Sequence, residues 1–496
     1  MSDQLKEKMI GALAWSSVDR VAQQAVQFII GIVLARLLEP ADYGLMGIVM
    51  IFAALSYVLV ESGYSSALVR TQGLTSQHTN TVFYTNLGIS ALLYLVVFFF
   101  APLIGEFFAD QRLVLLTRVT FLAVIFNALY LVPYALAGKE MDYQTITKVN
   151  LFATVCSGAT GIVMAFNGFG VWALAIQQIG YHFFRMTGFY FWTSWRPKLQ
   201  FSLQTLKGYT HFSTHMLGSS LLNVIFNKLY TTVFGKIYSQ TDVGYYNQAD
   251  KMSEMVLFTF QAILSTTYNL FARIQDQSER IRRIFRLTIK LSSLVTIPVL
   301  MVLIVAAEPV FFTLFGSKWM DSVPYFQWIC AAHLWSTIYI INGHALNSVG
   351  KSHISFRVEL FKRALTLITL ALGLYWNHLH PEYTVNQEIV VILMGFTFSC
   401  TAAWLLSMLC IRRHFDIHCT EQLHDLLPGV ALGVLVSAGC YGIGLCCENL
   451  YLRCIAELAS AVLLYLGGLR LISPSSWFRV INYLREKRIR KTQSIR

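Results

Sequence analysis

The stretch ARLLEPADYG, residues 35–44, decides the fold of this chain because a second copy of its pattern occurs later in the sequence. The second copy, GKIYSQTDVG at residues 235–244, repeats the aspartate and the closing glycine, so that Asp42 corresponds to Asp242. Each copy lies between two apolar stretches long enough to cross a bilayer, which takes about 20 residues. The repeat therefore predicts two homologous membrane lobes, an organisation typical of transporters whose substrate site lies between the halves.

Composition indicates an integral membrane protein. Of the 496 residues, 55% are hydrophobic and only 13% are charged, and the mean hydropathy is +0.55, whereas soluble domains carry about 25% charged residues. The net charge of +12 comes from Lys and Arg that fall mainly in every second segment between apolar stretches. This distribution is the positive-inside pattern. No nucleic-acid-binding motif accompanies the charge, so we expect no nucleic-acid partner.

The apolar stretches predict an all-α multi-pass membrane protein with about fourteen transmembrane helices, at 10–36, 42–66, 80–104, 113–137, 147–167, 170–192, 209–235, 244–271, 284–306, 322–348, 356–376, 388–411, 423–446 and 450–472. An even count puts both termini on one side, and the basic ends predict that this side is the cytoplasm. With six helices per lobe the repeat is parallel, and a lysine that ends a corresponding helix in each lobe, Lys139 and Lys351, supports the duplication. The predicted parts are an N-terminal lobe, a C-terminal lobe, two additional helices and a basic tail, at 1–195, 205–415, 416–475 and 476–496.

Polar side chains inside the predicted helices are the candidates for function, because they are costly in hydrocarbon. They form stripes at helical spacing on the first helix of each lobe, and we expect these stripes to face a central cleft as substrate-binding residues: Arg20, Gln23, Gln27, Asn223, Asn227 and Lys228. Four acids are candidates for ion coupling: Asp19, Glu61, Asp250 and Glu254. The alternative is structural, since amides often only join neighbouring helices and Asp19 could merely neutralise Arg20. Arg118, Arg185 and Lys251 are expected to extend towards lipid headgroups.

Enzyme and metal chemistry lack their usual motifs. The segment NSVGKS, residues 347–352, ends like a phosphate-binding loop, but Ala345 stands where that loop needs its first glycine. The histidines lack partners at the spacing of metal ligands. We therefore expect no cofactor, no metal and no enzymatic activity.

A family resemblance rests on the two copies in their wider context. LARLLEPADYG and VFGKIYSQTDVGYYNQADKM closely resemble the paired signatures of the polysaccharide transporter family, which includes the Wzx-type lipid-linked oligosaccharide flippases of the multidrug/oligosaccharidyl-lipid/polysaccharide exporter superfamily. APLIGEFFAD after the third predicted helix and AEPVFFTLFGSKW after the ninth extend the resemblance over nearly the whole chain. Many relatives have an acidic residue just before the position of Lys228, where this chain has Asn227.

The resemblance implies two six-helix lobes in a V that work by alternating access. It also implies translocation of an undecaprenyl-pyrophosphate-linked oligosaccharide across the bacterial cytoplasmic (inner) membrane, for lipopolysaccharide, capsule or exopolysaccharide biosynthesis. The implied partners are the lipid-linked substrate, membrane lipids, and polysaccharide polymerase and assembly proteins. A pyrophosphate needs fixed cations such as Arg20, since guanidinium suits its bidentate geometry. The rival hypotheses are a multidrug/cation antiporter of the same superfamily and a membrane glycan polymerase.

Overall fold

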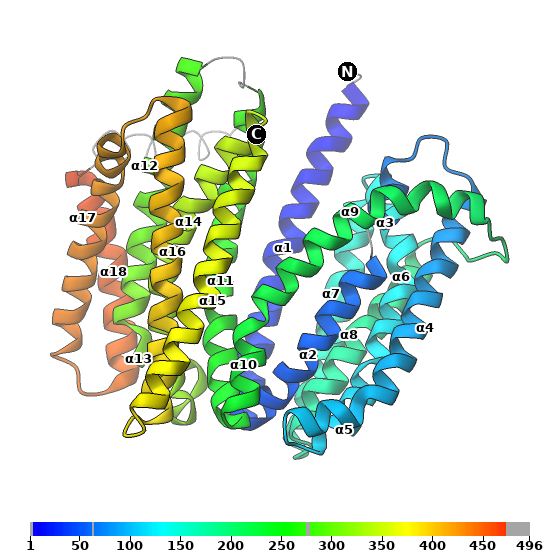
Figure 1. Ribbon diagram of the computed structural model, residues 1–496, viewed down its shortest axis with the longest axis horizontal. Helices are drawn as coiled ribbons and strands as arrows, with labels where there is room; N and C mark the ends of the chain where they lie inside the picture. The colour runs from blue at the N-terminus through cyan, green and yellow to red at the C-terminus, as the bar shows by residue number, and fades with distance from the viewer. Residues whose placement is uncertain (1–2, 62–63, 274–277, 473–496) are drawn as a thin grey trace, which may run out of the picture. The chain divides into compact units, whose positions relative to one another are not determined.

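A computed structural model describes residues 3–61, 64–273 and 278–472, and every regular element in these ranges is helical (Figure 1). The helices are α1 (Asp3–Leu37), α2 (Pro40–Glu61), α3 (Tyr64–Arg70), α4 (Ser76–Phe107), α5 (Arg112–Thr120), α6 (Leu122–Lys139), α7 (Tyr143–Phe166), α8 (Val171–Trp192), α9 (Leu203–Asn227), α10 (Leu229–Ile237), α11 (Gln240–Arg273), α12 (Ser278–Val305), α13 (Ala307–Phe315), α14 (Ser322–Ser348), α15 (Ser352–Leu379), α16 (Val385–Phe415), α17 (Cys419–Gly444) and α18 (Leu450–Ile472), with a 3-10 turn η1 (Ser317–Trp319).

The predicted all-α membrane class is confirmed. Each of the fourteen predicted ranges falls on one long helix or on a consecutive pair, and the pairs are α2 with α3, α5 with α6, and α9 with α10. In the described part of the chain, nine helices have the length and hydropathy needed to cross a membrane. The count of fourteen crossings therefore stays a prediction.

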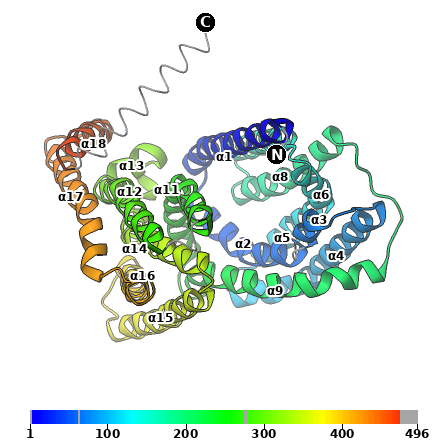
Figure 2. The ribbon, with the colours of Figure 1, turned by 90° about the horizontal axis from the view of Figure 1, so that it is seen from above.

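The chain divides into two compact units, Met1–Asn247 and Gln248–Arg496. In the first unit, α1 packs along α7, α7 along α8, and α8 against α6, while α9 crosses α2, α3 and α4 (Figure 2). In the second unit, α16 packs between α14 and α15, and α12 packs against α14 and α17. The first unit includes α9, α10 and the start of α11, whereas the sequence repeat predicts that the second lobe begins at residue 205. The lobe boundaries drawn from the repeat stay a prediction.

The repeated motif is a helix start in both copies. Helix α2 begins at Pro40, where proline's missing N–H costs nothing, and the Asp42 carboxylate reaches back to accept the Glu39 N–H at 3.1 Å. At the start of α11, the Asp242 carboxylate accepts the Ser239 N–H at 3.2 Å in the same way. Each aspartate therefore satisfies a backbone donor that the helix leaves free at its N-terminus. This local role explains why the aspartate recurs at the same position in both copies.

The recurring glycines let these two helix starts touch through their backbones. A Cβ on Gly44 would lie 1.8 Å from the Gln240 carbonyl oxygen, and a Cβ on Gly244 would lie 1.8 Å from the Pro40 carbonyl oxygen. The contact is thus reciprocal, with the glycine of each copy against the first residue of the other copy's helix. All four residues belong to the first unit. No residue other than glycine fits at either position without displacing a backbone.

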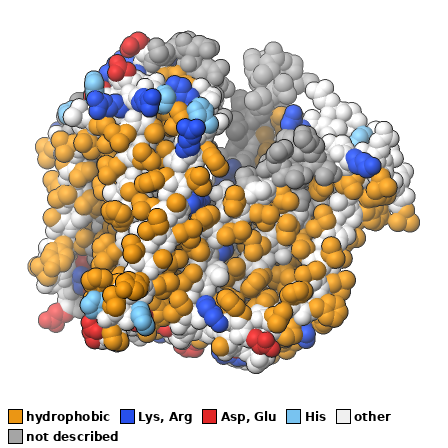
Figure 3. Space-filling model, in the orientation of Figure 1, with side chains coloured by type: hydrophobic (Ala, Val, Ile, Leu, Met, Phe, Trp, Pro, Cys, Tyr) orange, Lys and Arg blue, Asp and Glu red, His pale blue; other side chains and the backbone are white. Residues whose placement is uncertain are grey.

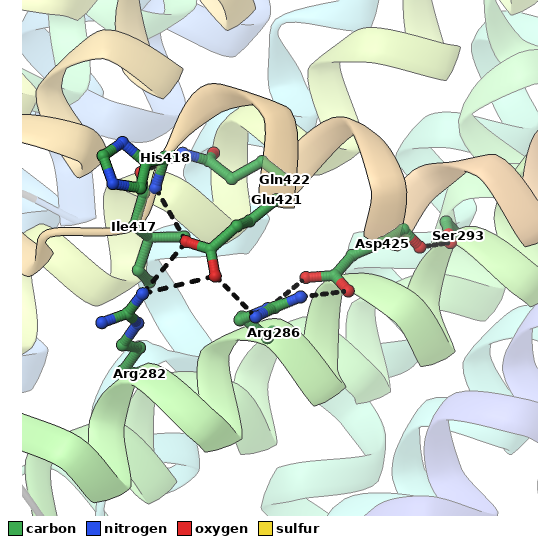
Figure 4. Close-up of polar contacts among 8 residues, drawn as sticks. All are labelled: Arg282, Arg286, Ser293, Ile417, His418, Glu421, Gln422 and Asp425. Carbon is green, nitrogen blue, oxygen red and sulfur yellow. Dashed lines mark hydrogen bonds and ion pairs between the residues drawn. The ribbon is translucent and has the colours of Figure 1, made fainter.

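Charged side chains attach α17 to α12 in the second unit (Figure 4). Arg286 donates from Nε to Asp425 Oδ2 at 2.8 Å and from Nη1 to Glu421 Oε1 at 2.8 Å, and Arg282 pairs with Glu421 at 3.1 Å. Just beyond this cluster the helices approach closely, since a Cβ on Gly429 would lie 2.6 Å from the Ser293 backbone. Helix α18 packs in turn on α17. Helix α17 is therefore held to α12 by ion pairs at one end and by backbone packing further along.

Candidate functional site

The polar stripe of α1 divides into a structural part and an unpaired part. Asp19 accepts a hydrogen bond from Gln23 Nε2 at 2.8 Å and from Asn150 Nδ2 of α7 at 3.2 Å. These bonds join α1 to α7, so Asp19 and Gln23 have the structural role that was the alternative to a functional one. Arg20 and Gln27 are exposed and make no hydrogen bond or ion pair with any residue that the structure describes. An arginine exposed on a membrane helix must face water, a headgroup or a polar ligand.

The stripe of α9 ends at a break in the helix. Asn223 and Asn227 are exposed and Lys228 is half-buried. Lys228 lies between α9 and α10 with φ −98° and ψ 3°, outside both helices. Breaks of this kind are where membrane transporters expose backbone groups to a substrate. Helix α1 packs on α7, whereas α9 packs on α2, α3 and α4, so the two stripes lie on helices with different neighbours in the first unit.

The four candidate acids have different surroundings. Asp19 is engaged as described, and Glu61, exposed at the end of α2, interacts electrostatically with Arg185 of α8. Glu254 is exposed on α11, where its charge acts on Lys251 one turn earlier. Asp250 lies one turn before Glu254, and its carbonyl oxygen accepts the Ser253 hydroxyl at 2.7 Å. Among the described residues no group of three His, Cys, Asp or Glu side chains is placed to hold a metal ion.

Arg185 occupies a cage of tyrosines, which differs from the predicted extension towards headgroups. Its guanidinium carbon lies 4.6 Å from the ring centre of Tyr130, 4.9 Å from that of Tyr134 and 5.8 Å from that of Tyr181. Nη1 donates to the Tyr130 hydroxyl at 3.1 Å, while Nε is buried without a partner among the described residues. Cation–π contacts of this kind contribute about 0.5–2 kcal/mol each. Arg118 likewise lies over an aromatic ring, that of Phe98, at 4.3 Å.

A hydrogen-bonded chain continues from this cage to α2. Tyr130 donates to Asn127 Oδ1 at 2.6 Å and lies 3.1 Å from His182 Nδ1. Since that hydroxyl already donates to Asn127, His182 donates to it from Nδ1, and its Nε2 accepts from Gln178 Nε2 at 3.3 Å. Gln178 also donates to the Tyr57 hydroxyl at 3.3 Å. Helices α2, α6 and α8 are thereby joined by polar groups around one half-buried positive charge.

A second charged cluster, which was not predicted from the sequence, lies on α15 in the second unit. Glu359 accepts from the Tyr339 hydroxyl at 2.6 Å and from Arg363 Nε at 2.6 Å, and Lys362 Nζ lies 3.9 Å from it. Lys362 also lies 5.2 Å from the Tyr339 ring centre. The cluster contains two cations and one anion. Three charged residues within five positions of the predicted span 356–376 were the signal that could have found it.

Comparison with known proteins identifies the family. A family model described as polysaccharide biosynthesis protein matches residues 33–324, which include both copies of the repeated motif. The chain belongs to this family. The match also includes the candidate residues of α9 and the Arg185 cage of α8. The resemblance inferred from the two motifs is therefore confirmed.

The curated relatives cover most of the chain at low identity. The chain is 22% identical to the succinoglycan biosynthesis transport protein ExoT of Rhizobium meliloti, over 86% of this chain and 90% of that protein. It is 24% identical to the lipopolysaccharide biosynthesis protein WzxC of Escherichia coli, over 74% of this chain and 76% of WzxC. It is 21% identical to the teichuronic acid biosynthesis protein TuaB of Bacillus subtilis, over 92% of this chain and 93% of TuaB.

Solved structures show the fold. An inward closed conformation of the lipid II flippase MurJ matches 92% of this chain and 98% of MurJ with a TM-score of 0.71 at 12% identity. An inward-facing multidrug resistance transporter of the MATE family matches 82% of this chain and 98% of its own with a TM-score of 0.63 at 15% identity. The chain therefore has the fold that these transporters share.

Proposed function

We propose that this protein is a flippase that moves an undecaprenyl-pyrophosphate-linked oligosaccharide across the bacterial cytoplasmic membrane for the assembly of a surface polysaccharide. The observation that carries the proposal is the family match over both copies of the repeated motif. Relatives named for succinoglycan transport and lipopolysaccharide biosynthesis support it, as does the fold shared with a lipid II flippase. The family and the structural neighbours are transporters rather than enzymes.

The proposed headgroup site uses two cations, Arg20 and Lys228, whose side chains have no partner among the residues the structure describes. A pyrophosphate that enters a membrane cavity loses hydration, and fixed positive charge must offset that loss. Arg20 is exposed and unpaired with described residues, and Lys228 lies at a helix break. Both are therefore available to a ligand, in contrast to Asp19, which is engaged between α1 and α7. Gln27 and Asn227, exposed on the same stripes, would hydrogen-bond the headgroup or the first sugar.

The proposed mechanism is alternating access between two six-helix lobes, with fourteen crossings and both termini in the cytoplasm. The duplicated motif supports the two lobes, and the alternating Lys and Arg support the orientation. Of the four candidate acids, Glu61 and Glu254 are exposed and remain available for ion coupling. A polysaccharide polymerase and assembly proteins are the proposed partners, because a flipped unit must be polymerised on the outer face.

The rival transport hypothesis is a multidrug/cation antiporter. The fold itself does not separate the two, since a multidrug transporter of the same fold matches the chain. The family match favours the flippase. The proposed cations favour it as well, because Arg20 and Lys228 would attract an anionic headgroup and repel a cationic drug.

Deletion of the gene tests the proposal. We expect lipid-linked repeat units to accumulate on the cytoplasmic face and surface polymer to fall, while synthesis of the units continues. Accessibility of the units to an impermeant glycan-labelling reagent, in intact and in everted vesicles, measures their side. Loss of the units altogether would instead indicate a role in their synthesis, and accumulation of the units on the outer face would indicate a polymerase.

A further inference from the structure

A group of basic side chains marks one end of the face formed by α15 and α16. The two helices are antiparallel, because Lys351 Nζ at the start of α15 lies 2.9 Å from His414 Nδ1 near the end of α16. We define the basic end as the six residues Lys351, His353, Arg357, Arg412, Arg413 and His414. Among the described residues none of its four Lys and Arg side chains forms an ion pair with a carboxylate. The nearest acid along α15, Glu359, is engaged by Arg363 and Tyr339.

The corresponding lysine of the first unit makes different contacts. Lys139 ends α6 in the first unit at the position that corresponds to Lys351, and its ammonium donates to the carbonyl oxygens of Leu68 and Thr71. Those carbonyls belong to the end of α3, so Lys139 stabilises a local turn. Lys351 contacts the side chain of His414 instead, and Arg413 and His353 are further neighbours of that histidine. In the first copy the lysine ammonium is hydrogen-bonded to backbone carbonyls. In the second copy it lies close to other basic side chains instead.

Below the basic end, both helices present apolar side chains outward along most of their length. On α15 the exposed positions continue from Arg357 through Phe361, Ile368 and Leu372. On α16 they continue from Arg412 back through Leu409, Leu405 and Phe398. Spacings of three, four and seven residues place each series on one side of its helix. Figure 3 shows this arrangement on the second unit. Lys, Arg and His side chains lie at one end, and a band of hydrophobic side chains lies next to them.

We propose that the basic end binds the phosphate of an anionic phospholipid of the cytoplasmic leaflet, with the acyl chains lying along the exposed apolar positions of α15 and α16. The unpaired cations supply charge complementarity for the headgroup. The adjoining apolar side chains fit hydrocarbon, which a soluble phosphate compound lacks. A phosphate bound here would also offset the repulsion between Lys351 and Arg413, both of which are neighbours of His414.

Native mass spectrometry of the full-length protein in detergent tests this site directly. The protein is titrated with phosphatidylglycerol or with phosphatidylcholine of the same chains, and the affinity for the first bound lipid is measured. We expect phosphatidylglycerol to bind more tightly. Since a Lys or Arg near an anionic lipid contributes about fivefold in affinity, Lys351→Gln with Arg413→Gln should weaken phosphatidylglycerol binding roughly 25-fold. Phosphatidylcholine binding should not change.

The matched control removes the same charge elsewhere on the second unit. Arg283 of α12 and Arg470 of α18 are exposed, and Arg283→Gln with Arg470→Gln should leave the affinity for phosphatidylglycerol unchanged. Where the first double variant has a lowered unfolding temperature, Arg412→Gln with Arg413→Gln replaces it, since neither side chain holds another in place. Equal losses in the test and control variants, or equal binding of the two lipids, would overturn the proposal.

Two further measurements separate this site from substrate binding. Inorganic phosphate should not displace the bound phosphatidylglycerol, and displacement would show that the site recognises phosphate without the lipid. Undecaprenyl pyrophosphate should bind the test variant as it binds the unchanged protein, and a loss there would assign the basic end to the substrate instead. Because lipid binding is read without any flipping, failure here leaves the proposed flippase function untouched.

Discussion

Arg20 and Lys228 matter at the scale of single residues because they are cations whose charge the described structure leaves uncompensated. Their neighbours on the same stripes are less available, since Gln23 donates to Asp19 and Asp19 is shared with Asn150. A charge in a membrane helix persists only with a ligand, a partner or water. The residues that act on an anionic headgroup should therefore be distinguished by charge rather than by hydrogen-bonding capacity.

Substitution of these cations tests that expectation. Arg20→Ala and Lys228→Ala should each lower flipping about 10- to 100-fold at normal membrane abundance, because a hydrogen bond to a charged group contributes about 1.5–3 kcal/mol. Arg20→Lys and Lys228→Arg should retain part of the activity. Gln27→Ala, which removes only a neutral hydrogen bond, should cost about fivefold. Flipping at the unchanged rate in both alanine variants would show that the headgroup site lies elsewhere, with the Arg185 cage the next place to test.

The tyrosine cage around Arg185 could not be predicted from the sequence. Tyr130 and Tyr134 are one helical turn apart, as are Tyr181 and Arg185, so each pair could be placed on one face of its helix. The sequence does not say that the two faces meet, because that depends on how α6 and α8 pack. Snorkelling was therefore the expected conformation for Arg185, whereas tyrosine rings on both helices surround its guanidinium.

At the scale of elements, the crossing of α2 with α11 depends on two glycines. Gly44→Ala or Gly244→Ala should each destabilise the protein by about 1–3 kcal/mol, because the added methyl overlaps a carbonyl oxygen and forces the helices apart. The double substitution should cost less than the sum, since the first displacement makes room for the second methyl. Thermal unfolding in detergent measures these differences.

Gly88→Ala is the control for that crossing. A Cβ on Gly88 of α4 would meet nothing within 4 Å, and alanine favours the helix over glycine by about 1 kcal/mol. The unfolding temperature of this variant should stay the same or rise. An equal fall in all three single variants would mean that the backbone contact contributes nothing specific.

The ion pairs between α12 and α17 make a second element-scale prediction. Arg286→Gln should raise hydrogen exchange in α17, because Asp425, whose side chain is only 10% exposed, loses its partner. Adding Asp425→Asn should restore much of the protection, since replacing both partners leaves no unpaired charge. Arg283→Gln, on the exposed side of the same turn, should leave α17 unchanged. Equal exchange in the Arg286 and Arg283 variants would show that backbone packing alone holds α17.

For the whole molecule, hydropathy and the repeated motif predicted most of the helices, because a membrane helix is defined by a length and an apolar composition that can be read directly. The sequence did not show why the motif is repeated. Only the structure shows that Asp42 and Asp242 each cap a helix and that Gly44 and Gly244 admit the other copy's backbone. The charged cluster of Glu359, Lys362 and Arg363 was not predicted, because the polar stripes lie on the first helix of each lobe whereas this cluster lies on α15.

Reconstitution of the purified protein tests the central claim most directly. Vesicles containing undecaprenyl-pyrophosphate-linked oligosaccharide are prepared with the protein, and an impermeant reagent measures how much of the glycan is reachable from outside. The account predicts that the whole pool becomes reachable with the unchanged protein, and that only the outer-leaflet share is reachable with the double variant Arg20→Ala and Lys228→Ala. If only the outer-leaflet share is reachable with the unchanged protein, while the same vesicles take up organic cations, the chain is an antiporter and the flippase account is wrong.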